Sequence, residues 1–263
     1  MTVALLITTY NWPEALELVL QSVLNQSRLP DELIIADDGS TDETRLLINK
    51  FRSLFSNELT HVWQEDRGFR KSEILNRALK ICNSDYIVQI DGDCILHKHF
   101  IKDHVRFSEP KVYLYGSRVN TKESFIEDLF NKKKTEFSPF DKQISKRTRA
   151  IYLPVLSKTY KPTNDLSSKI RGCNFSFWRK DALAIRGYDE IYKGWGKEDS
   201  DFAARLLHNG ILGKRIRYAG IVYHLWHKEA EKDHISISNS YLKSVLEEKR
   251  IYPQEGMAND KNL

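Results

Sequence analysis

The chain has 263 residues, 41% of them hydrophobic and 29% charged, a composition typical of a globular protein with one large α/β domain or two small ones. Its net charge of +5 is modest for a nucleic-acid-binding protein and no recognised RNA or DNA motif accompanies it, so we expect no nucleic-acid partner. The longest early apolar run, residues 3–7, is far shorter than the roughly 20 residues of a membrane span and lacks the features of a signal peptide, so we expect a cytoplasmic protein.

The first half of the chain alternates strand-like and helix-like patterns, which predicts a mostly parallel sheet with crossover helices. Short apolar runs predict four strands, at residues 3–8, 33–36, 61–63 and 86–90. Apolar residues at helical spacing predict three helices between and after them, beginning near residues 13, 41 and 72. We expect Asn11 to cap the first helix, and Ser40 with Glu43 to form a capping box for the second.

Polar motifs follow three of these strands. Residues 8–11, 37–40 and 91–93 all lie where a strand ends, and ligands of open α/β sheets bind outside the carboxyl ends of the strands. In the last motif Asp91 and Asp93 flank Gly92, so two carboxylates offer oxygen ligands to a hard cation and a residue without Cβ lets a bulky ligand approach. The same residues are also ordinary turn chemistry, and the motif alone leaves both interpretations open.

Past Val119 the pattern gives way to a polar, basic and proline-interrupted segment that runs to about Ser168. We interpret this segment as an insertion or a mobile region over the site. Its positive charge is concentrated at Lys132, Lys133, Lys134, Lys142, Lys146, Arg147 and Arg149. Such a group is typical of a solvated loop, and it is also typical of a segment attracted to an anionic membrane surface.

Regular patterns return in the last third of the chain. The sequence predicts a strand at residues 171–178, a helix from Asp181 and, after the motif at residues 194–201, an amphipathic helix that ends at Gly210. A last strand at residues 221–223 leads to His224.

Together, these motifs resemble those of glycosyltransferase family 2, whose GT-A fold binds nucleotide sugars. The matching positions are residues 8–11, 37–42 and 91–93, then Gly172, Asn174, residues 195–199 and residues 223–227. The second half is similar to the galactosyltransferase-type region of bacterial chondroitin polymerases and animal β4-galactosyltransferases. The resemblance implies one α/β domain with a Rossmann-like, mostly parallel central sheet flanked by helices. It also implies a nucleotide-sugar-binding half (1–118), the basic insertion or mobile segment (119–168), and an acceptor-binding and catalytic half (169–263).

For the donor, the resemblance implies a UDP-sugar site made of Thr8, Tyr10, Asp38, Arg70, Lys71 and Asp91. Tyr10 would lie against the base, and Asp38 would accept a uracil N–H, a sound device for specificity because an unpaired buried acid is costly. Arg70 and Lys71 would line the nucleotide or diphosphate pocket, or they form a solvated helix start. For Asp38 the alternative is a simple turn before the second helix.

For the metal, the resemblance implies a Mn²⁺ or Mg²⁺ ion between the two donor phosphates, with Asp93 and His224 as protein ligands. Asp91 would contact the ribose or a water of the metal. His227, three residues beyond His224, is the less favoured alternative ligand. The three cysteines lie far apart without a CxxC pair, and the chain has no HExxH motif, so we expect free thiols and no zinc hydrolase.

For catalysis, the resemblance implies Asp199 as the general base, Glu198 as a ligand for acceptor hydroxyls and Trp195 as a flat apolar face for a sugar ring. Another interpretation is that these acids favour a helix N-terminus through its dipole. We prefer catalysis for Asp199, because of the preceding Trp-Gly pair. For Asp201 we prefer a structural role, an i,i+4 pair with Arg205.

The expected function is that of an inverting, metal-dependent glycosyltransferase. It would move a hexose or N-acetylhexosamine, with a galactose-type sugar favoured, from a UDP-sugar to a glycan or lipid-linked saccharide acceptor. The setting would be bacterial surface polysaccharide or lipopolysaccharide synthesis, in the cytoplasm or peripherally at the inner membrane. The alternative is a catalytically silent nucleotide-sugar or glycan-binding module on the same fold. Nucleotidyl transfer is less favoured because it leaves residues 195–199 without a role.

Overall fold

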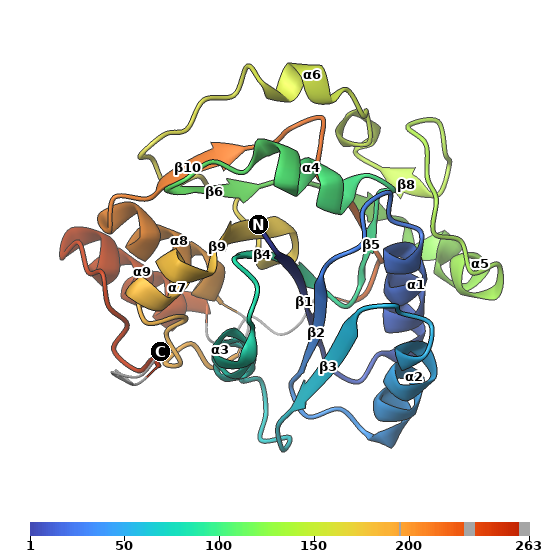
Figure 1. Ribbon diagram of the computed structural model, residues 1–263, viewed down its shortest axis with the longest axis horizontal. Coiled ribbons are helices and arrows are strands. Elements are labelled where there is room, and N and C mark those ends of the chain that lie inside the picture. The colour runs from blue at the N-terminus through green and yellow to red at the C-terminus, as the bar shows by residue number, and fades with distance from the viewer. Residues whose placement is uncertain (195, 229–234, 258–263) are drawn as a thin grey trace.

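The computed structural model describes residues 1–194, 196–228 and 235–257, and its centre is a seven-stranded sheet (Figure 1). The strands follow the order β10 (Leu212–Arg215), β6 (Val112–Tyr115), β9 (Phe175–Trp178), β4 (Tyr86–Asp91), β1 (Val3–Thr9), β2 (Glu32–Asp37) and β3 (Glu58–Trp63). A smaller sheet has the order β5 (Cys94–Leu96), β11 (Ile221–His224), β7 (Ser117–Thr121) and β8 (Ile144–Ser145). The helices are α1 (Pro13–Leu24), α2 (Asp42–Arg52), α3 (Lys71–Ile81), α4 (Phe100–Phe107), α5 (Ile126–Asn131), α6 (Pro154–Ser157), α7 (Arg179–Ala184), α8 (Glu198–His208) and α9 (Ile235–Glu247).

Most neighbouring strands of the large sheet run parallel. β1 pairs with β2 and β4, β2 pairs with β3, and β10 pairs with β6. The exception is β9, which lies antiparallel between β4 and β6. A strand from the second half of the chain is thus inserted among strands from the first half. The prediction of an α/β fold with a mostly parallel central sheet flanked by helices is confirmed.

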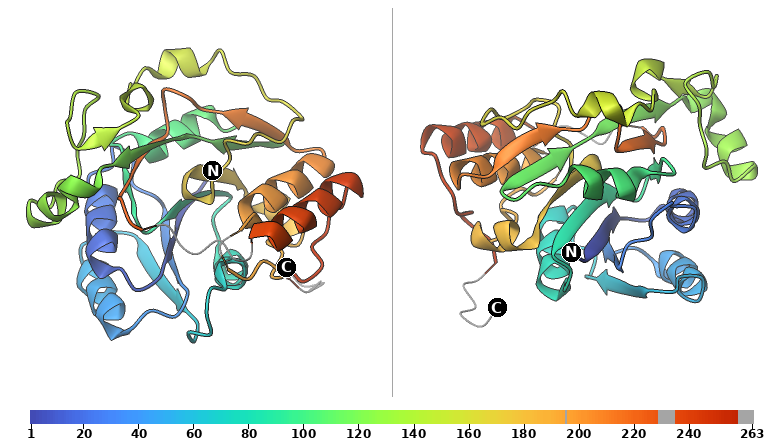
Figure 2. Two further views of the ribbon diagram at one scale, coloured as in Figure 1. Left: turned by 180° about the vertical axis from the view of Figure 1, so that it is seen from behind. Right: turned by 45° about the horizontal axis from the view of Figure 1, so that its top comes forward.

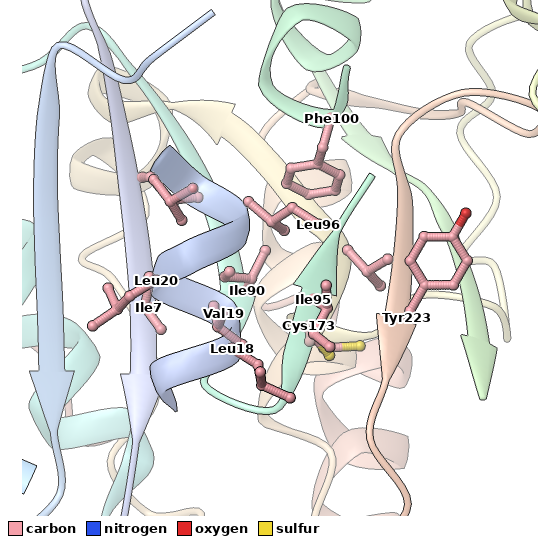
Figure 3. Packing of buried hydrophobic residues seen from close by; sticks show 14 of the residues in the cluster. Ile7, Leu18, Val19, Leu20, Ile90, Ile95, Leu96, Phe100, Cys173 and Tyr223 are labelled. Carbon is pink, nitrogen blue, oxygen red and sulfur yellow. The ribbon is translucent and has the colours of Figure 1, made fainter. Parts of the chain in front are cut away.

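Helices cover both faces of the large sheet (Figures 1 and 2). Val3, Leu5 and Ile7 of β1 belong to one buried cluster with α1 and α2, whereas Ala4 and Leu6 belong to another with α3, α7 and α8. Every residue of β1 is buried, which is why the strand reads as a continuous apolar run rather than an alternating one. The first cluster continues into β5 and β11, so the smaller sheet shares its core (Figure 3).

Both predicted helix caps are wrong, and the reason is the same for each. Trp12 and Thr41 occupy the N-cap positions of α1 and α2, and neither helix has a side-chain cap. Asn11, in the left-handed region at φ 43°, instead accepts a hydrogen bond from the backbone N–H of Thr41 at 2.8 Å. The backbone N–H of Asn11 donates to Ser40 Oγ at 2.9 Å. These side chains therefore tie the two loops to each other, a tertiary pairing that local capping rules do not contain.

The second half differs from the predicted elements in two places. Only residues 175–178 of the expected strand at 171–178 form β9, because Gly172–Asn174 fold into a 3₁₀ turn. The basic segment at 119–168 contains α5, α6, two short 3₁₀ helices and β8, which pairs with β7. β7 itself runs across residue 118, the expected end of the first segment. The segment is thus built onto the smaller sheet.

Two further predictions concern the whole chain. Cys82, Cys94 and Cys173 are buried and free, as predicted. Within the described ranges, we find no helix with the length and apolar character needed to span a bilayer.

Candidate active site

Three polar motifs meet at the carboxyl edge of the large sheet, as the sequence predicted. Parallel pairing sets Thr8 opposite Asp91 and Thr9 opposite Asp37, so the ends of β1, β2 and β4 lie side by side. Thr8 Oγ1 donates a hydrogen bond to Asp91 Oδ1 at 2.8 Å, and the backbone N–H of Gly92 donates to the Thr8 carbonyl at 2.7 Å. A Cβ on Gly92 would lie 3.0 Å from that carbonyl oxygen, so the close approach of the two loops favours glycine.

Asp38 lies in a small polar cradle next to these strand ends. Its carboxylate accepts hydrogen bonds from Gln64 Nε2 and, at 2.8 Å, from the backbone N–H of Arg70. Burial raises the pKa of Asp38 against the opposing effect of these bonds. A carboxylate offers about four acceptor positions, and the bonds found among the described residues use two of them. Tyr10 is 52% exposed, and its hydroxyl donates to Asp66 Oδ2 at 2.9 Å.

The two basic residues at the start of α3 serve different purposes. Arg70 sends its guanidinium to Glu73, at 2.7 Å, and to the Glu65 carbonyl, so its backbone N–H rather than its side chain serves the Asp38 cradle. Lys71 Nζ donates to Asp91 Oδ1 at 2.6 Å and lies 3.9 Å from Glu198 Oε1. Burial lowers the pKa of Lys71, but the charges of Asp91 and Glu198 outweigh it and hold that pKa above its usual range. Lys71 therefore links the end of β4 to the start of α8.

A possible metal centre is built where β5 meets β11. Antiparallel pairing sets His224 opposite Cys94, which brings the imidazole to the neighbouring Asp93. His224 Nε2 and His227 Nε2 each lie 3.3 Å from Asp93 Oδ2. Burial raises the pKa of Asp93, but interactions with both histidines outweigh it and hold that pKa below its usual range. The ring of Trp12 meets His227 edge to face, with centroids 5.8 Å apart.

The three side chains of this centre fit a divalent ion. One ligand atom from each of Asp93, His224 and His227 falls within 4.8 Å of the others. A carboxylate oxygen with two imidazole nitrogens suits Mn²⁺ or a similar transition metal better than Mg²⁺. Asp91 is outside this group, since Thr8 and Lys71 hold its carboxylate. Of the two histidines that the sequence offered as alternatives, the structure brings both to the same oxygen.

Two carboxylates stand at the N-terminus of α8. Asp199 Oδ2 accepts a hydrogen bond from the backbone N–H of Gly172 at 2.9 Å, and Asp199 Oδ1 accepts one from Ser200 Oγ at 3.2 Å. Glu198 is only 8% exposed; burial raises its pKa to about 7, with the Asp199 charge adding to this effect and Lys71 opposing it. Trp195, the third residue expected here, lies outside the described residues.

Asp201 has the structural role that the sequence favoured. Its carboxylate accepts a hydrogen bond from Arg205 Nε at 2.7 Å, and both side chains are fully buried.

Sequence reasoning missed two glutamines of the site. Gln64 holds Asp38, while Gln89 donates to the Gly172 carbonyl at 3.3 Å and accepts from the Tyr188 hydroxyl at 2.8 Å. Gln89 carried a signal, because it is the one polar residue inside the apolar run at residues 86–90. Gln64 carried none, since it follows a short strand among other polar residues.

Family comparisons cover most of the chain. Residues 4–177 match the model described as glycosyl transferase family 2, and residues 156–228 match the one described as N-terminal domain of galactosyltransferase.

Curated relatives are much longer proteins. The chain is 25% identical over 229 residues to hyaluronan synthase of Pasteurella multocida, covering 81% of this chain and 23% of that protein. It is 24% identical over 239 residues to chondroitin synthase of Escherichia coli, covering 84% and 34%. The chain thus spans between 23% and 34% of the length of these relatives.

Solved structures share the fold. The mannosyltransferase PcManGT from Pyrobaculum calidifontis, in complex with GDP-Man and Mn²⁺, has a TM-score of 0.60 at 20% identity, covering 87% of this chain and 58% of that one. S. aureus TarS in complex with UDP-GlcNAc has a TM-score of 0.60 at 17% identity, covering 88% and 60%.

Proposed function

The chain belongs to glycosyltransferase family 2, as its motifs predicted, and from this premise we propose that it transfers a sugar from a nucleotide-sugar donor to a glycan or glycolipid acceptor. One observation carries the proposal: a polar cradle at Asp38, a metal-ligating group at Asp93 and a carboxylate at Asp199 converge beside one edge of the sheet. The names of the relatives, which are polysaccharide synthases, support it. The GT-A fold implied by the motifs is confirmed by the structures it resembles.

For the donor, we propose a UDP-sugar. The acceptor positions of Asp38 that the described residues do not use suit a uracil N–H, and the half-exposed ring of Tyr10 offers a face for the base. We assign Thr8, Asp91, Arg70 and Lys71 to the same donor site, because Thr8 and Lys71 hold Asp91 and the Arg70 N–H holds Asp38. A galactose-type sugar remains the favoured one, because residues 156–228 match a galactosyltransferase model.

For the metal, we propose that Asp93, His224 and His227 hold Mn²⁺ or Mg²⁺. When bound, such an ion supplies a Lewis acid that neutralises charge on the departing diphosphate, an effect of several kcal/mol. Asp91, whose carboxylate is held by Thr8 and Lys71, is oriented to accept a hydrogen bond from the ribose or from a water of the metal.

For the chemical step, we propose a single displacement with Asp199 as base. Asp199 takes the proton of the acceptor hydroxyl, whose oxygen forms a bond to the anomeric carbon while the bond from that carbon to the diphosphate oxygen breaks. The electron pair of the broken bond leaves with the nucleoside diphosphate, and attack from the opposite face inverts the anomeric configuration. The Gly172 N–H fixes Asp199 Oδ2, while Glu198 binds acceptor hydroxyls and Trp195 offers an apolar face to the sugar.

A transfer assay tests the proposal. Wild type, Asp93→Ala and Asp199→Asn are assayed with a panel of UDP-sugars and Mn²⁺, with Arg52→Gln, an exposed change on α2, as control. A base contributes typically 10²- to 10⁴-fold, so we expect a loss of about that size for Asp199→Asn and a comparable loss for Asp93→Ala. Transfer untouched by both changes would exclude this mechanism. A UDP-dependent rise in melting temperature without any turnover would favour the silent binding module instead.

We further propose that the protein acts in surface polysaccharide or lipopolysaccharide synthesis, in contact with the cytoplasmic face of an anionic membrane. The segment at 119–168 supports this, because Phe140 is 88% and Val155 63% exposed, close in sequence to the exposed Lys142 and Arg147. Co-sedimentation should show stronger binding to phosphatidylglycerol vesicles than to phosphatidylcholine vesicles, and weaker binding for Phe140→Ser. Equal binding to both lipids would contradict membrane contact through charge.

A further inference from the structure

A cavity of about 150 Å³ with a basic lining lies beside Gly172. It is bounded by residues 116–118 at the start of β7, Asn174 just before β9, the end of β10, and residues of the 119–168 segment and its continuation. Among the residues that the structure describes, the lining contains no acidic residue and six basic ones: Arg118, Lys146, Arg149, Lys169, Arg171 and Arg215. We call this feature the basic cavity.

No ion pair neutralises the positive charge of the basic cavity within the described parts of the chain. There, none of the six basic side chains forms an ion pair with a carboxylate. Burial together with the charges of Arg149, Arg118 and Arg171 lowers the pKa of Lys146. Arg215 Nε is buried and has no hydrogen-bond partner among the described residues. Like charges held together in this way oppose folding unless an anion joins them.

The basic cavity lies next to the candidate base. Its residue Arg171 directly precedes Gly172, whose N–H holds Asp199 Oδ2 at 2.9 Å. The neighbouring wall is rigid, because Asn174 Nδ2 donates to the Ser117 carbonyl at 3.1 Å and to the Gly220 carbonyl at 2.7 Å. An anion in the cavity would therefore be held at a fixed position relative to Asp199.

We propose that the basic cavity binds an anionic group of the acceptor, a carboxylate or a phosphate, and so selects an acidic acceptor over a neutral one. The inference rests on the proposed function, since a transferase is what gives this chain an acceptor. A water molecule occupies about 30 Å³ in the liquid, so the cavity has room for a group of a few heavy atoms rather than for a whole oligosaccharide. The guanidinium fork matches the oxygens of carboxylate and phosphate, and four of the six basic residues are arginines.

Binding of three matched probes to the full chain tests the proposal. Octyl β-glucoside is neutral, octyl β-glucuronide carries a carboxylate, and the octyl phosphodiester of glucose carries a phosphate, so the last two distinguish the sources of the anion. We expect at least one charged probe to bind roughly tenfold more tightly than the neutral one at low salt. We expect Arg215→Gln and Arg149→Gln to remove this preference, and Arg215→Lys to keep part of it. Arg52→Gln, which lies on α2, is the charge-matched control.

The other outcomes distinguish failure of this proposal from failure of the proposed function. Equal binding of all three probes, or a preference that survives both glutamine variants, would show that the basic cavity does not select the acceptor. The affinity for UDP is measured separately. If the glutamine variants lose as much affinity for UDP as for the charged probes, the basic cavity serves the donor phosphates and not the acceptor. If UDP-sugars fail to bind even the wild type, the proposed function fails, whereas the preference between probes is measured without UDP and is judged by itself. Unchanged melting temperatures of the variants exclude misfolding as the cause.

Discussion

At the scale of single residues, the site depends on a few side chains that each hold another group in place. Lys71 joins Asp91 to Glu198, Gln64 holds Asp38, and the Gly172 N–H holds Asp199. At the start of α8, the pKa of Glu198 is raised to about 7, because this side chain is buried beside another acid. Since Lys71 opposes that effect only in part, the charge of Glu198 is costly in the folded protein.

The perturbed pKa of Glu198 predicts how stability depends on pH. Its pKa is about 7 when folded, against 4.5 for an ordinary glutamate, so between these values the unfolded chain loses the proton first. Stability from this group is therefore lost as pH rises from about 4.5 to 7. We compare the unfolding free energy of Glu198→Gln with that of wild type at each pH. We expect this difference to shift in favour of the variant by on the order of 1–3 kcal/mol between pH 4.5 and pH 8.

Urea denaturation at both pH values measures this difference. Glu43→Gln, a change at an exposed glutamate of α2, is the control and should leave the difference between the two pH values unaltered. A Glu198→Gln variant with the same pH dependence as wild type would show that Glu198 is ionised at an ordinary pKa.

At the scale of elements, α8 carries the carboxylates for which we propose a catalytic role, and that role requires a fixed orientation of the helix. Its first turn carries Glu198, Asp199 and Asp201, and Asp201 forms a fully buried pair with Arg205 one turn later. Arg205 Nη1 also donates to the Ile185 carbonyl, at the end of α7, at 3.0 Å. The pair thus ties α8 to the end of α7, while Asp199 and Glu198 at the start of α8 contact Gly172 and Lys71.

We expect the buried pair of α8 to be strongly coupled. Asp201→Asn alone leaves the Arg205 charge buried and uncompensated, which should cost about 3–5 kcal/mol of unfolding free energy. Replacing both residues, with Asp201→Asn and Arg205→Met, should cost less than the sum of the single changes. A double-mutant cycle by urea denaturation measures this coupling.

An exposed pair at the same spacing provides the reference cycle. Asp128 lies in α5 and Lys132 directly follows that helix. Their Oδ1 and Nζ atoms lie 2.6 Å apart on the surface, and the pair should couple by less than about 0.5 kcal/mol. Equal coupling energies in the two cycles would show that the pair on α8 does not anchor the helix.

At the scale of the whole molecule, a buried polar junction joins the two sheets. His104 of α4 lies with Nδ1 2.7 Å from Ser176 Oγ of β9 and Nε2 3.2 Å from Asn174 Oδ1. Asn174 in turn reaches the carbonyls of Ser117 and Gly220, which flank the smaller sheet. This junction sets the position of the smaller sheet, and so of His224, relative to the large one.

The junction should weaken in acid. Burial lowers the pKa of His104 to about 3, against the hydrogen bond with Asn174, which raises it. The unfolded chain takes up the proton below about 6.5, so stability is lost as pH falls from 6.5 towards 3. We expect His104 to account for about 2–3 kcal/mol of the loss between pH 7.5 and 4.5.

The comparison of two variants isolates this effect from other titrating groups. His104→Gln keeps hydrogen-bonding capacity without a proton to gain, and its unfolding free energy should fall less between pH 7.5 and 4.5 than that of wild type. His208→Gln, at the end of α8, serves as the matched histidine control. A His104→Gln variant that loses as much stability in acid as wild type would contradict a neutral buried His104.

Much of the fold and part of the site follow from local patterns. Strands buried on both faces need continuous apolar runs, so the parallel core strands could be predicted at residues 3–8 and 86–90. The helix caps could not be predicted, because Asn11 and Ser40 bind each other's loops rather than their own helices. The acidic motifs could be located from the sequence, because each directly follows an apolar strand-like run, but the motifs alone also fitted ordinary turns. The role of Gln64 could not be predicted, because its partner Asp38 is 26 residues away.

The sequence by itself determined the fold class, the family and the residue types of the site, because these depend on patterns within short segments. Tertiary structure alone decided which of these residues meet. The pairing of β5 with β11 brings both His224 and His227 to Asp93, and the packing of α3 against α8 brings Lys71 to Glu198. The basic cavity has the same origin: its lining comes from residues 116 to 215, whose like charges gather only when the chain folds.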